Sequence, residues 1–169
     1  FVLDVLHLNA QETTSLVGVG MMGMAIMSLF SQLVVIPKLD PSVRTMLISG
    51  AILLVIPFCM FLLPMSKTLL VVSMVISGFG FGLIRTGTAA GASLVVEPEE
   101  QGAVAGLIGA TAAIGIIFVP ITAMALYSYV DPVAPYILGL VVSAFMLFMV
   151  SGAGFRHMNR VLSQDTPII

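Results

Sequence analysis

Five long apolar stretches follow one another along this chain, and each is long enough to cross a lipid bilayer as a helix. A membrane-spanning helix needs about 20 largely apolar residues. The predicted spans cover residues 13–36, 45–65, 69–96, 102–130 and 135–155. The sequence therefore predicts an all-α integral membrane protein in which the lipid bilayer is the solvent for most of the surface. No second domain is expected, because the connections between the spans are all short.

The composition argues against a soluble domain. Of the 169 residues, 59% are hydrophobic and only 8% are charged, whereas soluble domains contain about 25% charged residues. The mean hydropathy is +1.18. The net charge of −2 is thinly spread, so no nucleic-acid partner is predicted. The single cysteine, Cys59, and the two isolated histidines predict no disulfide, metal site or cofactor.

Basic residues predict how the spans are oriented. Four of them flank the same side of the predicted bundle: Lys38, Arg44, Arg156 and Arg160. Lys67 lies alone on the other side. Cytoplasmic loops are enriched in Lys and Arg, so we expect a multi-pass protein of the cell membrane with a cytoplasmic C-terminus and residues 1–12 on the outer side. The chain begins at Phe1, and we interpret it as part of a longer protein.

Small residues form stripes in the third and fourth spans. The third contains Gly78, Gly80, Gly82, Gly87 and Gly91, and the fourth contains Gly102, Gly106, Gly109 and Gly115. Glycines four residues apart let another helix approach closely, so tight packing is the first interpretation of most of them. The second interpretation is bending during a conformational cycle. Gly106, Gly115 and Pro120 are the candidate hinge, because proline removes a helix hydrogen bond.

Arg85 is the only charge between Leu69 and Val96. A guanidinium stays protonated at any accessible pH, and one at the bilayer centre costs about 3 kcal/mol on insertion scales. In a helix, Phe81, Arg85 and Thr88 share one face, which offers an aromatic ring, a cation and a hydroxyl. We predict that this face binds a small, anionic or amphipathic substrate. The alternative is a permanent structural pair between Arg85 and a carboxylate or backbone carbonyls.

Other polar residues within the spans give weaker signals. Gln32, Ser28 and Ser31 lie toward the cytoplasmic end of the first span. Hydrogen bonds between helices are the first interpretation of this group, and Gln32 is also a candidate for contact with substrate. Thr111 and Thr122 are expected to bond back to their own helix.

Residues 78–120, GFGFGLIRTGTAAGASLVVEPEEQGAVAGLIGATAAIGIIFVP, resemble the tenth and eleventh helices of the major facilitator superfamily, especially its drug:proton antiporter branch. Residues 33–47, LVVIPKLDPSVRTML, look like that family's loop between helices eight and nine. Gly106, Gly115 and Pro120 keep the spacing of the antiporter motif, although Val119 replaces the glycine before its proline. The chain also departs from the family pattern at Arg85, where members often have an apolar residue.

This resemblance implies that the five helices are helices eight to twelve, and so form most of a C-terminal six-helix bundle. It further implies a secondary transporter that works by alternating access, with proton-coupled efflux of a small molecule. The implied partners are the missing N-terminal half, the substrate and protons. The spans contain no carboxylate or histidine, so a proton carrier is expected in the missing half.

Two other classes of protein compete with a transporter. An intramembrane enzyme would need a nucleophile and a base, or metal ligands, at depth. The spans offer Ser and Thr without such partners, so no enzyme is predicted. A non-transporting membrane scaffold or assembly subunit, with Arg85 in a structural ion pair, fits the small-residue stripes equally well.

Overall fold

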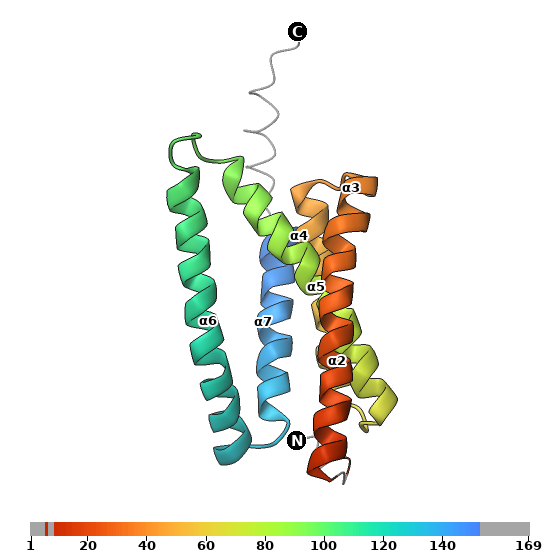
Figure 1. Ribbon diagram of the computed structural model, residues 1–169. Coiled ribbons are helices and arrows are strands. Elements are labelled where there is room, and N and C mark those ends of the chain that lie inside the picture. The colour runs from red at the N-terminus through yellow and green to blue at the C-terminus, as the bar shows by residue number, and fades with distance from the viewer. Residues whose placement is uncertain (1–5, 7–8, 153–169) are drawn as a thin grey trace.

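Five long helices make up the structure, a computed structural model that describes residue 6 and residues 9–152 (Figure 1). The first helix is built from α2 (Ala10–Phe30), η1 (Ser31–Val35) and α3 (Ile36–Leu39). The others are α4 (Val43–Met60), α5 (Lys67–Ser93), α6 (Gln101–Tyr129) and α7 (Ala134–Ser151). All five are long and apolar enough to cross a membrane. The predicted all-α membrane architecture is therefore confirmed.

Side-chain caps set where three of the helices begin. Asn9 Oδ1 accepts a hydrogen bond from the Glu12 amide at 2.8 Å, and the Glu12 carboxylate accepts one from the Asn9 amide at 3.3 Å. This capping box starts the first helix at Ala10, three residues before the predicted start at residue 13. Ser42 and Ser66 cap α4 and α5: their hydroxyl oxygens accept hydrogen bonds from the amides of Thr45 and Leu69. Each cap satisfies a backbone amide that has no partner inside its helix.

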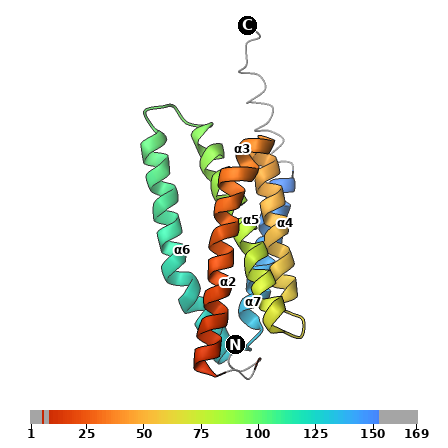
Figure 2. The same cartoon turned by 45° about the vertical axis from the view of Figure 1, so that its right-hand side comes forward.

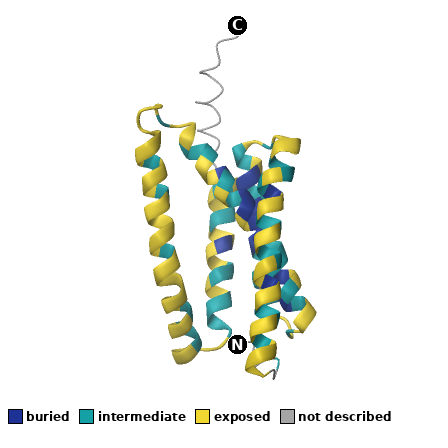
Figure 3. Cartoon of the chain, in the orientation of Figure 1, coloured by how far each residue is buried: buried dark blue, intermediate teal, exposed yellow. Residues whose placement is uncertain are grey.

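Helix α5 lies at the centre of the packed part of the bundle. It packs against α2 on one side and α4 on another, and α4 in turn packs against α7 (Figures 1 and 2). The buried apolar side chains come from α4 and α5: Met46, Leu47, Ala51, Leu54, Leu70 and Leu83. Figure 3 shows the buried residues gathered mainly where α2, α4 and α5 meet.

Helix α6 is set apart from this core in both views (Figures 1 and 2). None of its residues is buried, and its ribbon is almost wholly exposed in Figure 3. Its main contacts are with α5 and α7, the helices that precede and follow it in the chain. The first helix, α4, α5 and α7 thus form a packed group, and α6 lies beside it with few contacts.

The short connections place successive helices antiparallel, as expected. Lys38 and Arg44 flank the turn between α3 and α4, whereas Lys67 begins α5 at the opposite end of the bundle. Arg156 and Arg160, which also support the predicted orientation, lie outside the described residues, as does much of the 1–12 segment. The orientation in the membrane stays a prediction.

Candidate functional site

The three predicted residues of α5 lie together on one exposed face. Phe81, Arg85 and Thr88 are all exposed, and 46% of the surface of Phe81 is accessible. The opposite side of the same turns is buried and carries Leu83 and Gly87. The helical geometry therefore divides α5 into a face that packs in the bundle and a face that carries the aromatic ring, the cation and the hydroxyl. We call Phe81, Arg85 and Thr88 the α5 polar face.

Arg85 belongs to a helix long and apolar enough to cross a membrane, and it lies closer to the Ser93 end of α5 than to its start. The helix has 27 residues and is therefore about 40 Å long. Arg85 precedes Ser93 by eight residues, or about 12 Å along the axis. With α5 centred in a hydrocarbon core of about 30 Å, the Cα of Arg85 lies about 7 Å inside the boundary. A charge at this depth requires a counter-ion, a water-filled cavity or a path to the interface.

No such counter-ion is present in the part of the chain that the structure describes. The guanidinium of Arg85 makes no hydrogen bond or ion pair with any described residue. The structural pair considered from the sequence is therefore not formed within these residues. The side chain remains available to a group that lies outside them.

Gln32 occupies a different setting. Its amide nitrogen donates to the backbone oxygen and to the hydroxyl oxygen of Ser28, both at 3.1 Å. The Ser31 hydroxyl donates to the same Ser28 backbone oxygen at 2.8 Å. The first interpretation of this group, hydrogen bonding between helices, is wrong for the bonds that the structure contains. The side chains instead bond within their own helix. Gly82 of α5, which lies against Ser28 and Ser31, has no side-chain partner to offer.

A π-helical segment, η1, interrupts the first helix at these residues and was not foreseen from the sequence. Helix α5 approaches the first helix closely here: a Cβ at Gly82 would overlap Ser31 Oγ and lie 2.7 Å from the Ser28 backbone oxygen. One turn away, a Cβ at Gly78 would overlap the backbone of Met24. π-Helical turns inside α-helices are often found at functional sites. The available signal was the pair of small residues, Ser28 and Ser31, one turn apart on the first helix, with Gly82 opposite them on α5.

The candidate hinge residues lie along α6. Gly106 and Gly115 have nothing within 4 Å of where a Cβ would stand, and Pro120 lies inside the helix. Tight packing is thus not the role of these glycines within the described residues. Thr111 and Thr122 donate to Leu107 and Phe118 of their own helix, each at 2.9 Å, as predicted.

An apolar cavity of about 480 Å³ lies between α4, α5, α6 and α7. Phe81 of the α5 polar face is part of its wall, together with Phe58 of α4, Ala123 of α6 and Val142 of α7. Its polar lining side chains are Tyr136 and Ser143. The cavity could not be predicted from the sequence, because it depends on how far α6 stands from its neighbours.

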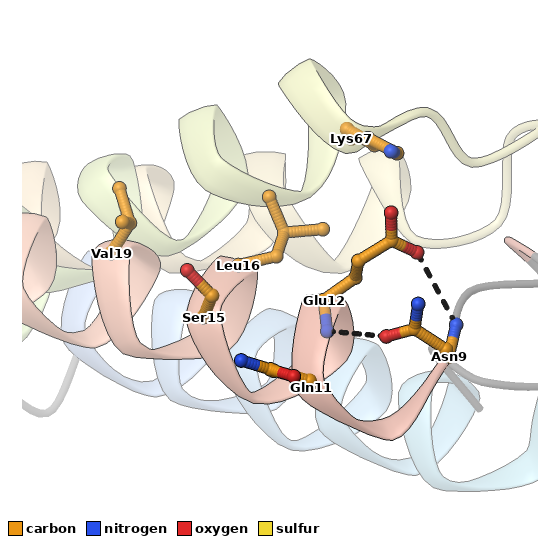
Figure 4. A pocket seen from close by; sticks show the side chains of 7 residues that line it. All are labelled: Asn9, Gln11, Glu12, Ser15, Leu16, Val19 and Lys67. Carbon is orange, nitrogen blue, oxygen red and sulfur yellow. Dashed lines mark hydrogen bonds between the residues drawn. The ribbon is translucent and has the colours of Figure 1, made fainter.

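A second hollow lies at the opposite end of the bundle from Lys38, between the starts of α2 and α5. Figure 4 shows Lys67 on α5 across from Glu12 on α2, whose carboxylate is turned toward Asn9. The two charges form no ion pair within the described chain. Glu12 acts there as a helix cap. Among the described residues, no group of three or more His, Cys, Asp or Glu could hold a metal ion.

Comparison with known proteins identifies the family. The family model of the Major Facilitator Superfamily matches residues 1–158, which is nearly the whole chain. No curated protein and no solved structure gives a significant match. The family match agrees with the five apolar helices and with the resemblance seen in residues 78–120. The chain belongs to the Major Facilitator Superfamily, a family of membrane transporters and not of enzymes.

Proposed function

We propose that the chain forms helices eight to twelve of a secondary transporter and that its α5 polar face lines the substrate path. The substrate is a small anionic or amphipathic molecule, bound by Arg85, Phe81 and Thr88, with Gln32 contributing from the first helix. The observation that carries this proposal is Arg85: an intramembrane guanidinium on an exposed face, with no partner among the described residues.

Charge favours an anionic substrate over a cationic one. In a medium of low dielectric constant, two like charges repel strongly at short distance, and opposite charges attract. A carboxylate or phosphate group can also accept two parallel hydrogen bonds from a guanidinium. The neighbouring ring of Phe81 and hydroxyl of Thr88 extend the same face with an apolar and a polar contact. A molecule with one anionic group and an apolar part matches all three.

Proton-coupled efflux by alternating access is the mode of transport that the resemblance to the drug:proton antiporter branch supports. Arg85 does not release a proton, and the one carboxylate in a described membrane-spanning helix, Glu12, lies in the first turn of α2. The titrating group is therefore assigned to the N-terminal half of the transporter. Gly106, Gly115 and Pro120 would let α6 bend as the two halves rock, because nothing among the described residues packs against the two glycines.

The test is transport by the complete protein in vesicles, with Arg85, Arg85→Lys and Arg85→Ala compared at equal expression. Loss of anion transport in Arg85→Ala, with a partial loss in Arg85→Lys, supports the proposal. Unchanged transport in Arg85→Ala contradicts it. Failure of Arg85→Ala to insert or fold supports the alternative, in which Arg85 holds the protein together through a structural pair.

A further inference from the structure

The cavity between α4, α5, α6 and α7 has the size and chemistry of a binding site for an apolar group. Its volume of about 480 Å³ falls in the range of roughly 300–1,000 Å³ that small-molecule sites occupy. Aliphatic and aromatic side chains make up most of the wall: Leu54, Phe58, Phe81, Val119, Leu138 and Val142. A polar molecule would lose its hydrogen bonds to water on entering such a space.

Two polar side chains, Ser143 and Tyr136, stand in a wall that is otherwise apolar. The Ser143 hydroxyl donates to the backbone oxygen of Gly139 at 2.8 Å, within its own helix. The ring of Tyr136 stacks against Phe61 with 4.7 Å between the ring centroids. Ser143 therefore directs its proton toward its own helix, and the space in front of it is suited to hydrocarbon.

Small residues keep the cavity open and fix its wall. Gly139 of α7 lies so close to Phe58 of α4 that a Cβ at Gly139 would overlap the Phe58 ring. The ring is thereby held against the backbone of α7. On the other side, α6 contributes Ala123, whose short side chain leaves the volume unfilled.

Phe81 connects this cavity to the α5 polar face. Its side chain lines the cavity, and Arg85 follows it by one helical turn, about 6 Å along the axis of α5. A molecule with an apolar body in the cavity would thus carry an anionic group within reach of Arg85. Both parts of such a molecule would meet a complementary surface.

We infer that the cavity between α4, α5, α6 and α7 binds the aromatic or aliphatic body of an amphipathic monoanion whose charged group lies at Arg85. The role given to Arg85 rests on the proposed function, whereas the binding of an apolar group rests on the lining of the cavity alone. The occupant is a molecule of naphthalene-carboxylate type and not a lipid acyl chain, because the charge lies one turn from the cavity and inside the hydrocarbon.

Tryptophan reporters can detect the occupant directly. This chain contains no tryptophan, and the emission of the parent transporter, without the introduced indole, is subtracted as background. Val142 and Val141 are adjacent in α7 and equally exposed, at 58% and 57%, but only Val142 lines the cavity. The complete transporter carrying Val142→Trp or Val141→Trp is placed in lipid nanodiscs and titrated with 6-bromo-2-naphthoate, whose bromine quenches indole emission.

The inference predicts saturable quenching of Val142→Trp and only a weak, linear response of Val141→Trp. Added to the Val142→Trp protein, Ala123→Phe should raise the half-quenching concentration at least tenfold by filling the cavity. Ala125→Phe, two residues along α6 and outside the cavity lining, should leave it unchanged. Equal linear quenching of both reporters, which is the behaviour of a probe dissolved in lipid, would overturn the inference.

A further substitution separates this inference from the proposed function. Arg85→Gln in the Val142→Trp protein should weaken quenching about tenfold if the anionic group lies at Arg85. Saturable quenching that does not change in Arg85→Gln would keep the cavity as a site and remove the role of Arg85. If Ala123→Phe is not monodisperse on gel filtration, Ala123→Leu fills less of the cavity and is expected to give a smaller shift in the same direction.

Discussion

Helices α5 and α6 are both rich in glycine, yet their glycines have opposite surroundings. In α5, the place of a missing side chain is taken by another helix: Met24 lies against Gly78, and Gly50 and Leu53 lie against Gly80. In α6, Gly102, Gly106, Gly109 and Gly115 have no neighbour within 4 Å. A stripe of glycines therefore predicts the possibility of close approach, and only the opposing helix decides whether the approach occurs.

The difference lies in what stands opposite each glycine. Gly78 of α5 meets the backbone of Met24, and Gly82 meets Ser28 and Ser31 of the first helix. Gly80 meets Gly50 of α4, with 3.0 Å between a Cβ at Gly80 and the Gly50 backbone oxygen. Helix α6 finds no such partner among the described residues. Helix α5 thus packs in the bundle through one side and leaves the other side, with Arg85, exposed.

The largest effect is expected from Gly78→Leu. Its side chain must occupy the space of the Met24 backbone, and overpacking of a core typically costs about 1–3 kcal/mol and sometimes more. Because backbone cannot yield as a side chain can, we expect a loss of about 3 kcal/mol or more in the free energy of unfolding, measured by titration with a denaturing detergent. The matched control is Gly109→Leu on α6, where nothing lies within 4 Å. An equal loss in both variants would show that the two stripes are packed alike in the complete transporter.

The next effect concerns Gly82→Ala, where the added methyl group would overlap Ser31 Oγ. We expect a destabilisation of about 2 kcal/mol, part of which should be recovered in the double variant Gly82→Ala/Ser31→Gly. The recovery, of about 1 kcal/mol, is read from a double-mutant cycle. Additive single effects, with no recovery, would show that Ser31 is not what limits the approach of the helices.

Much of the fold could be predicted from the sequence, because five apolar stretches joined by short turns leave few alternatives to five antiparallel helices. Helix ends were less predictable. The apolar stretch predicted a first helix that begins at residue 13, but the capping box of Asn9 and Glu12 starts it at Ala10. The shared face of Phe81, Arg85 and Thr88 followed from helical periodicity alone. The π-helical turn at Ser31–Val35 and the cavity beside Phe81 depend on the fit between helices, which periodicity does not encode.

Pro120→Ala is expected to change stability less than the glycine substitutions do, and to act mainly on the rate of transport. Proline interrupts the backbone hydrogen bonds of α6, so the substitution should stiffen this helix without disturbing a packed neighbour. We expect a melting temperature that is unchanged or higher, with transport slowed about tenfold in vesicles. The control is Pro57→Ala, since Pro57 is buried in the packed helix α4 and its loss should lower stability instead. Unchanged transport in Pro120→Ala would show that transport does not require α6 to bend at Pro120.

The smallest effects are expected from Thr111→Val and Thr122→Val. Both hydroxyls bond to the backbone of their own helix, and both residues are exposed. Their loss should change the free energy of unfolding by less than about 0.5 kcal/mol, the usual range for substitutions outside a packed core. A clear loss of stability in either variant would indicate that α6 is packed on that side in the complete transporter.

The central claim is that Arg85 selects an anion on the exposed face of α5. It is tested most directly by uptake of 2-naphthoate and of its neutral amide into vesicles that contain the complete transporter, Arg85→Gln or Arg85→Lys. We predict that the unsubstituted protein prefers the anion at least tenfold, that Arg85→Gln loses this preference while still taking up the amide, and that Arg85→Lys is intermediate. Lysine reaches the interface as readily as arginine but cannot form the paired hydrogen bonds. Equal uptake of both compounds by all three proteins would contradict the claim.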